Sequence, residues 1–502
     1  MYYAHQKPNG ESPVKKLFGY IIVAIAFLVL GMFLADTQVA DVARQTAKSA
    51  RSAAVEVVGN SAGIETRTMV LAENPQIISR LMEGGSFGGE YSVEAAQNMF
   101  GRTEDAIEDV NKKTHVVEVG PGSYLIRMPI VNAAFFVTDE GVVLVDTGMG
   151  PAGPAILAAI RSVTDQPIHT IIYTHGHVDH AYGTWAIMEA GEKPQIIAHE
   201  LLEPRFNRYI RLRGSLAKYM SQPEEQLPAS TSDLVWPTRY FSDRLEIEVG
   251  GETFVLQHHK GETDDQLYVW VPGRKALASA DYYQGFLPNA GNGKRFQRHV
   301  EEWSAAMKEM AALEPAILLP AHGEPITDTA TIQENFLVLA EAFDYIIDHT
   351  IEGLNAGKRK DQVYGSVQLP EHLANHPSLN VQYVTPNDIS KMVIKKYTGW
   401  WDDIPSNWTP ASMEDQGNMI IELAGGNIPT IVEYARGLIG RDIRLASHLT
   451  DWLFYARPDD PAVQQLVFDT YKTRIMDPDT NTMEMLTYLD QMTAARERAR
   501  AQ

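Results

Sequence analysis

The spacing of hydrophobic and polar residues changes along the chain, and each change predicts a different kind of structure. Residues 17–35 form an uncharged apolar run that is long enough to cross about 30 Å of hydrocarbon as a helix. Polar helix formers follow, then short β-branched runs between Gly and Pro turns, and finally apolar residues with helical spacing. These changes predict four parts with the boundaries 1–36, 37–112, 113–332 and 333–502.

The apolar run at residues 17–35 is expected to be an uncleaved, single-pass membrane anchor. Lys15 and Lys16 precede it and Asp36 follows it, so the positive-inside rule leaves the N-terminus in the cytoplasm. The expected location is the inner (cytoplasmic) membrane, with the remaining chain on the periplasmic, extracytoplasmic side. The alternative is a cleaved signal peptide, although the run exceeds a typical signal core and no clear cleavage site follows it.

Residues 113–332 are expected to form a layered α/β domain. Short buried strands such as 168–175 alternate with helical segments such as 151–166, and this alternation is typical of sheets covered by helices. Residues 37–112 are predicted to form a helical stalk, and residues 333–502 an all-α domain.

Composition narrows the chemistry that this chain can carry. Its 502 residues include 64 acidic and 43 basic ones, which give a net charge of −21 and argue against a nucleic-acid partner. The chain has no cysteine, so disulfides, thiolate nucleophiles and cysteine zinc sites are excluded. Any metal ion must therefore bind to His, Asp or Glu.

The strongest candidate for chemistry is the run that contains His175, His177, Asp179 and His180, directly after a predicted strand. Imidazole and carboxylate groups are the ligands left to a zinc site without cysteine, and residues at alternate positions of a loop can converge on one ion. The alternative is a capped turn whose histidines make ordinary hydrogen bonds, but three histidines and one aspartate within six residues favour a metal site.

A strand followed by Thr-His-x-His-x-Asp-His resembles the metallo-β-lactamase superfamily. The resemblance implies an αββα sandwich and a centre of two Zn²⁺ ions, with manganese or iron as alternatives at a carboxylate-rich site. By the same resemblance Asp146 supports the metal loop, Asp281 bridges the two ions and His322 is the last histidine ligand. Asp179 and Asp146 are the expected catalytic residues.

One motif departs from the common pattern of the superfamily. Most members have Pro-Gly-His-Thr where this chain has Lys-Gly-Glu-Thr, which ends at Thr263, and that change resembles the alkyl sulfatase branch. Glu262 then serves as a ligand, with His259 as its rival. The helical phrases of the last part resemble the alkyl sulfatase dimerisation domain and imply a homodimer. The expected metal ligands are His175, His177, Asp179, His180, Glu262, Asp281 and His322.

The resemblance also implies a substrate site and a reaction. Asn289, Lys294 or Arg295, and Tyr383 match the positions that grip a sulfate head group, although a solvated loop or core packing are alternatives. The expected reaction is hydrolysis of an amphiphilic alkyl sulfate ester to an alcohol and inorganic sulfate by a zinc-activated hydroxide. Hydrolysis of a lactone, thioester or phosphate ester and a non-catalytic membrane-tethered scaffold are the alternative functions.

Overall fold

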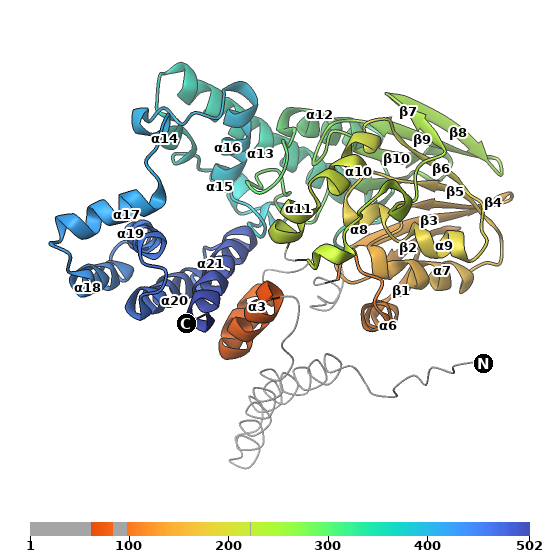
Figure 1. The fold of residues 1–502 in the computed structure, drawn as a ribbon. Coiled ribbons are helices and arrows are strands. Elements are labelled where there is room, and N and C mark those ends of the chain that lie inside the picture. Colours follow the sequence, from red (N-terminus) through yellow and green to blue (C-terminus); the bar gives the residue numbers. More distant parts are fainter. Residues whose placement is uncertain (1–61, 84–97, 221, 502) are drawn as a thin grey trace, which may run out of the picture. The chain divides into compact units, whose positions relative to one another are not determined.

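The computed structural model describes residues 62–83, 98–220 and 222–501 (Figure 1). These residues fall into two compact units. One unit holds the described residues up to Ile78 together with Met413–Arg474 and the chain from Tyr488 onward, and the other holds Ser79–Ser412 and Ile475–Thr487.

Seven strands form the first sheet of the larger unit, in the order β1-β2-β3-β4-β5-β6-β7. Neighbours from β1 to β4 are antiparallel, and neighbours from β4 to β7 are parallel. Nearly every residue of β3, β4 and β5 is buried, as expected for strands covered on both faces. The strands are β1 (His115–Gly120), β2 (Ser123–Arg127), β3 (Asn132–Thr138), β4 (Gly141–Val145), β5 (Ile168–Ile172), β6 (Gln195–His199) and β7 (Arg239–Phe241).

Five strands form the second sheet, in the order β12-β11-β10-β9-β8. Only β11 and β12 are parallel within it. Phe136 and Phe254, one from each sheet, meet with ring centroids 5.5 Å apart in an apolar layer to which both sheets contribute. The strands are β8 (Arg244–Val249), β9 (Glu252–His258), β10 (Leu267–Val271), β11 (Ala276–Ala280) and β12 (Ile317–Pro320).

Helices cover the outer face of each sheet and complete an αββα sandwich. Helices α6 (Glu104–Lys113), α7 (Gly153–Arg161) and α9 (Thr184–Glu189) share a buried cluster with β3, β4 and β5. Helices α12 (Val300–Ala312) and α13 (Thr329–Asn355) share another with β10, β11 and β12. The predicted sandwich is therefore present.

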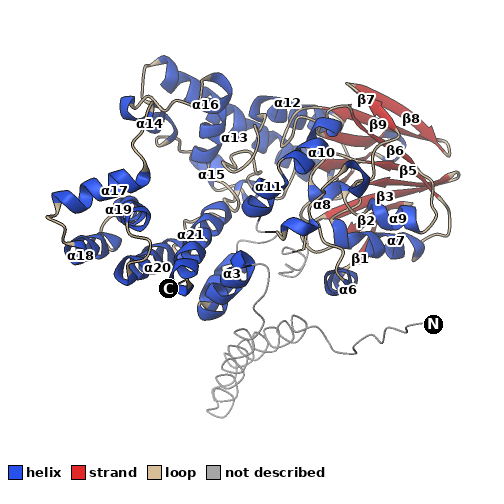
Figure 2. Ribbon diagram, in the orientation of Figure 1, coloured by secondary structure: helices blue, strands red, loops and turns tan. Residues whose placement is uncertain are grey.

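No strand follows β12 in the described part of the chain, and Figure 2 draws the labelled elements from α13 to α21 as helices. Thr385 begins α16 with a capping box, in which its side chain accepts from Asp388 N and the Asp388 side chain accepts from Thr385 N. The predicted all-α part is thus confirmed as helical. The other helices are α3 (Ala62–Glu73), α4 (Pro75–Glu83), α8 (Val178–Ala181), α10 (Leu202–Arg211), α11 (Arg213–Met220), α14 (Lys360–Tyr364), α15 (Glu371–Ala374), α16 (Pro386–Tyr397), α17 (Met413–Leu423), α18 (Ile428–Ile439), α19 (Ile443–Ala456), α20 (Pro461–Met476) and α21 (Thr482–Arg500).

The domain boundaries predicted from the sequence stay a proposal. In the structure, α13 packs on the sandwich through Phe336 and Phe343, so its residues belong to the same unit as the sheets. Helices α17, α18 and α19 belong to the other unit. The apolar spacing of a helix predicts that one face is buried but leaves open which partner covers that face.

The membrane-spanning helix of the predicted fold class is corrected. Residues 17–35 lie outside the described residues, and within the described ranges no helix is both long and apolar enough to cross a membrane. The longest described helix, α13, has 27 residues, but five of them are acidic and its apolar face packs on protein. The predicted membrane attachment and single-pass inner-membrane location are corrected with it.

Replacing Trp303 with Ala should lower the free energy of unfolding by about 3–5 kcal/mol because it removes a buried aromatic side chain. Trp303 is fully buried, lies 5.7 Å from Phe343 between ring centroids, and donates to Tyr282 O at 3.0 Å. Trp303→Phe keeps most of the packing and should cost about half as much or less. Chemical denaturation of both variants measures this, and equal losses would contradict the packing argument.

Candidate metal centre

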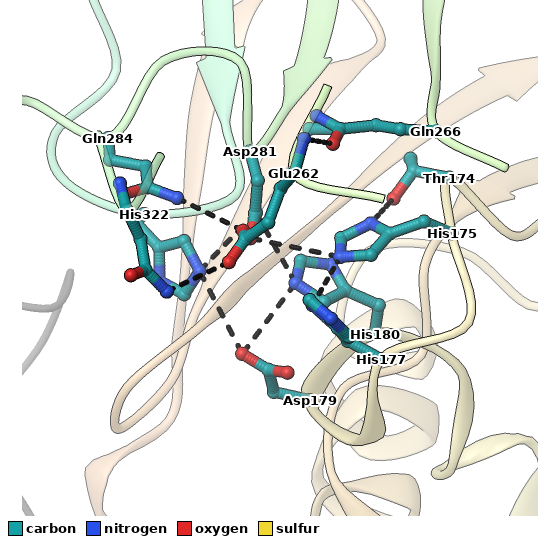
Figure 3. A network of polar contacts seen from close by, with 12 residues as sticks. Thr174, His175, His177, Asp179, His180, Glu262, Gln266, Asp281, Gln284 and His322 are labelled. Carbon is teal, nitrogen blue, oxygen red and sulfur yellow. Dashed lines mark hydrogen bonds and ion pairs between the residues drawn. The ribbon is translucent and has the colours of Figure 1, made fainter. Parts of the chain in front are cut away.

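The loop after β5 brings four polar side chains to one place. The buried strand ends at Ile172, and α8 begins at Val178 with His177 at its N-cap. Between them the chain bends closely past α10, where a Cβ on Gly176 would lie 2.8 Å from Arg205 Cγ. Any larger residue at this position would therefore force the Arg205 side chain to move. Figure 3 shows His175, His177, Asp179 and His180 turned toward a common space.

Seven side chains from four separate segments converge there in two clusters. Glu262 comes from the loop after β9, Asp281 directly follows β11, and His322 follows β12. Within each cluster the candidate ligand atoms lie within 4.8 Å of one another. The structure thus brings together all the residues expected to bind metal. The first cluster contains His175, His177, Glu262 and Asp281, and the second contains Asp179, His180 and His322.

Asp281 belongs to the first cluster and also contacts two residues of the second cluster (Figure 3). Its Oδ1 is 3.3 Å from His180 Nε2 and 3.3 Å from His322 Nε2, and its Oδ2 is 3.8 Å from His175 Nε2. The side chain is buried, with 3% of its surface exposed. One carboxylate is therefore within reach of a cation in either cluster, as its expected bridging role requires.

Contacts outside the clusters fix the orientation of the histidine rings. Asp146, with a φ of 64°, accepts from Thr174 N at 2.8 Å and from Thr174 Oγ1 at 2.7 Å. Its Oδ2 also lies 2.9 Å from His180 Nδ1. Because the Thr174 hydroxyl proton is used on Asp146, Thr174 Oγ1 accepts from His175 Nδ1 at 3.1 Å. Asp146 therefore contacts both Thr174 and His180 of the histidine loop. These contacts support the role predicted for it, which is to hold that loop in place.

The same contacts point three Nε2 lone pairs into the site. His180 Nδ1 donates to Asp146, His175 Nδ1 to Thr174, and His322 Nδ1 to Ile130 O at 2.7 Å. In the neutral form, each ring then has its lone pair on Nε2. A histidine that binds a metal ion in proteins is held in this way.

Polar atoms of the site fit a metal ion better than they fit each other. His180 Nε2 and Asp281 Oδ1 are buried, and neither has a hydrogen-bond partner of good geometry among the described residues. His175 Nε2 and His177 Nδ1 lie 2.9 Å apart and converge on the same space. Leaving such atoms unsatisfied is costly, and a cation would satisfy them. The donor set of imidazoles and carboxylates suits zinc, manganese or iron.

Burial and neighbouring charges shift the pKa values of the site. Burial holds the pKa values of His175 and His177 well below the usual range, which favours the neutral form that binds metal. Burial would also lower the pKa values of His180 and His322, but nearby carboxylates, Asp281 first, raise both, that of His322 to about 9. Burial raises the pKa of Glu262 to about 8.

The remaining predicted residues make different kinds of contact. Asn289 Nδ2 donates to Glu262 Oε1 at 2.9 Å, so its amide contacts a candidate ligand. The main-chain N–H groups of Lys294 and Arg295 both donate to Asn292, and both side chains are half-buried. Tyr383 packs against the core cluster beneath α13, which is the alternative given for it above. The substrate roles of these residues stay predictions.

His259, the rival of Glu262, is not part of either cluster. Its Nε2 lies 2.8 Å from Glu309 Oε2 instead.

Sequence reasoning missed three buried charged residues around the ligands. Arg298 pairs with Glu262 at 2.8 Å. Asp265 Oδ2 accepts from Gly176 N at 2.8 Å, and Arg205 Nε lies 3.5 Å from Asp265 Oδ1. This chain of contacts connects the histidine loop to the Glu262 loop and to α10. Asp265 stands three positions after Glu262, which is a usable signal, whereas no spacing marks either arginine.

Comparison with known families covers most of the chain. Residues 127–322 match the metallo-β-lactamase superfamily, and residues 359–497 match the alkyl sulfatase dimerisation domain. The resemblance found in the sequence motifs is thereby confirmed. The superfamily match and the two clusters together support a metal centre.

Individual relatives agree with these matches. A linear primary-alkylsulfatase of Pseudomonas sp. is 26% identical over 65% of this chain and 67% of its own length. An alkyl/aryl-sulfatase of Saccharomyces cerevisiae is 22% identical over 69% of this chain, which spans 58% of that relative. The solved structure of a stereoselective inverting sec-alkylsulfatase from Pseudomonas sp. shares the fold, with a TM-score of 0.66 and 17% identity over 88% of this chain and 78% of that one.

Binding of Zn²⁺ at pH 7 should release more than one proton per chain. Without metal, His322 with a pKa of about 9 and His180 with its raised pKa both hold protons at this pH. A cation displaces these protons, so affinity should fall about tenfold per pH unit for each proton displaced as the pH decreases. Calorimetric titration in two buffers of different ionisation enthalpy measures the release, and identical heats would contradict it.

Asp146→Asn should weaken metal binding by about 10–100-fold while leaving the fold intact. Asparagine tolerates the left-handed φ at this position, but its neutral amide cannot match the charge that orients His180. A chelator competition assay measures the affinity. Asp139→Asn, an exposed change on a turn, is the control, and equal affinities in the two variants would contradict the role given to Asp146.

Proposed function

We propose that this chain, which joins a metallo-β-lactamase superfamily domain to an alkyl sulfatase dimerisation domain, is a metal-dependent hydrolase of amphiphilic alkyl sulfate esters. The products would be an alcohol and inorganic sulfate. One observation carries the proposal: Glu262 joins His175 and His177 in a metal cluster of a chain that also matches the dimerisation domain.

The residues divide naturally between two cations. His175, His177 and Glu262 would hold one ion, Asp179, His180 and His322 would hold another, and Asp281 would contact both, a division supported by the two observed clusters. Two zinc ions are proposed, with manganese or iron as alternatives. Ions bound there would supply Lewis acidity and lower the pKa of water toward neutrality.

The protein side chains would orient the reactants. Asp179 is the carboxylate of the second cluster, and its side chain is 16% exposed, so it would be in reach of a water molecule from which it could accept a proton. Lys294 and Arg295 follow Asp281 on the same loop and could supply positive charge to an anionic head group. Their half-burial would strengthen that attraction relative to open solvent.

A homodimer is the proposed assembly. The match of residues 359–497 to the dimerisation domain supports it. Large apolar side chains at Met419, Leu423 and Tyr434 are more than half exposed on α17 and α18, where a second copy could cover them.

Purified protein should hydrolyse a medium-chain alkyl sulfate, lose the activity on chelation and regain it with Zn²⁺. Asp281→Asn should lower kcat/KM by more than about 100-fold, beyond the usual cost of losing an outer partner of a metal ligand. His259→Ala is the matched control: it removes a nearby imidazole outside the clusters and should keep activity within a few-fold. Sulfate release and elemental analysis are the measurements.

A substrate panel separates the alternatives. Turnover of a lactone, thioester or phosphate ester without turnover of alkyl sulfates would contradict the substrate proposed here. A metal-loaded protein that hydrolyses none of these esters would favour a scaffold.

A further inference from the structure

The carboxylate of Glu262 is held by three side chains from the segment between β11 and α12. Arg298 Nη2 lies 2.8 Å and Asn289 Nδ2 lies 2.9 Å from Oε1, whereas Gln284 Nε2 lies 3.3 Å from Oε2. A carboxylate oxygen has two lone pairs, so two donors saturate Oε1 while Oε2 keeps one lone pair. Oε2 is therefore the oxygen that remains able to bind a cation.

The main chain of Glu262 is fixed as well. Its N–H donates to Gln266 Oε1 at 2.7 Å, and its carbonyl oxygen accepts from Arg298 Nη1. Arg298 thus binds the side chain and the main chain of the same residue. Two such contacts leave the Glu262 carboxylate little freedom to rotate away from the cluster.

Both partners of the Arg298 and Glu262 pair are deeply buried. The side chains are 1% and 4% exposed, respectively. A buried guanidinium is costly unless it is paired, and the ion pair that the described residues give Arg298 is the one with Glu262. The positive charge is therefore committed to this one carboxylate.

The ion pair between Arg298 and Glu262 changes the net charge of the candidate metal site. The two clusters contain three carboxylates, Asp179, Glu262 and Asp281. The positive charge of Arg298 cancels the negative charge of Glu262, so the pair adds no net charge to the cluster. In this respect the pair resembles the neutral imidazoles of His175 and His177. The oxygen lone pair of Glu262 remains available, so the pair can substitute for a third histidine in this cluster.

We propose that Arg298 is a positioning residue that makes Glu262 a net-neutral metal ligand and turns its Oε2 toward the cation. Arg298 acts through Glu262, because its guanidinium contacts the side chain and the main chain of that residue and a guanidinium has no lone pair to offer a cation. This inference rests on the metal centre of the proposed function and not on its substrate.

The test is a double-mutant cycle read out by metal binding. Arg298→Met should weaken Zn²⁺ binding about 10–100-fold, and Arg298→Lys, which keeps the charge but has a different donor geometry, should recover part of the loss. In a Glu262→His background, Arg298→Met should cost less than about threefold, because a neutral ligand needs no balancing charge. Chelator competition gives the affinities, and the visible spectrum of Co²⁺-loaded protein reports the ligand set.

Arg274→Met is the control for the loss of a partly buried, ion-paired arginine. Arg274 pairs with Glu252 and donates to the main chain at Val137 O, outside both metal clusters. It should lower stability without changing Zn²⁺ affinity or the Co²⁺ spectrum. Wild-type affinity in Arg298→Met, or an equal loss in the Glu262→His background, would overturn the proposal.

The outcomes also separate this inference from the proposed reaction. If Arg298→Met does not fold, the Arg298→Lys variant and the Glu262→His, Arg298→Met double variant still decide, because the proposal requires the double variant to bind metal. If the cycle shows coupling but the wild type hydrolyses no alkyl sulfate, the role of Arg298 stands and the substrate proposal fails.

Discussion

The burial of the Asp281 carboxylate is the constraint on which the site depends. A carboxylate that is almost fully buried needs positive charge or hydrogen-bond donors nearby, and it has His180 and His322 at 3.3 Å. These residues follow strands of both sheets, so the sandwich must pack with those strand ends at the same edge. Packing of the apolar layer between the sheets and formation of the polar site are therefore a single structural requirement.

The histidine loop could be predicted from the sequence pattern itself. The ligands that lie far from it in the chain could be predicted only through resemblance to a known family. His175 and His180 are close in the chain, so one loop suffices to bring them together. Glu262 and His322 could be assigned only because their motifs matched a known order. Arg298 could not be predicted, because a buried ion pair between distant segments produces no local sequence pattern. Its pairing with Glu262 depends on how the loop after β9 packs against the start of α12.

The fold, like the site, could be predicted from the sequence only where it depends on local patterns. Alternating strands and helices predicted the layered domain, since strand and helix periodicity are local properties. The number of sheets, the pairing of β11 with β12 and the attachment of α13 to the sandwich depend on which apolar faces meet. The membrane prediction fell on residues 17–35, which lie outside the described residues, and within the described ranges no helix is both long and apolar enough to cross a membrane. Tyr383 packs against the buried cluster that contains α13, and its predicted contact with a substrate stays a prediction.

The contact of Asp281 with residues of both clusters has a thermodynamic consequence. An ion bound in one cluster would fix the orientation of the Asp281 carboxylate toward the other cluster. The same ion would also withdraw part of the negative charge of that carboxylate. If two cations bind as proposed, their occupancies would be linked, and by reciprocity each ion would change the affinity of the other by the same factor. Loading of such a centre would then be a coupled equilibrium with a distinct half-filled species.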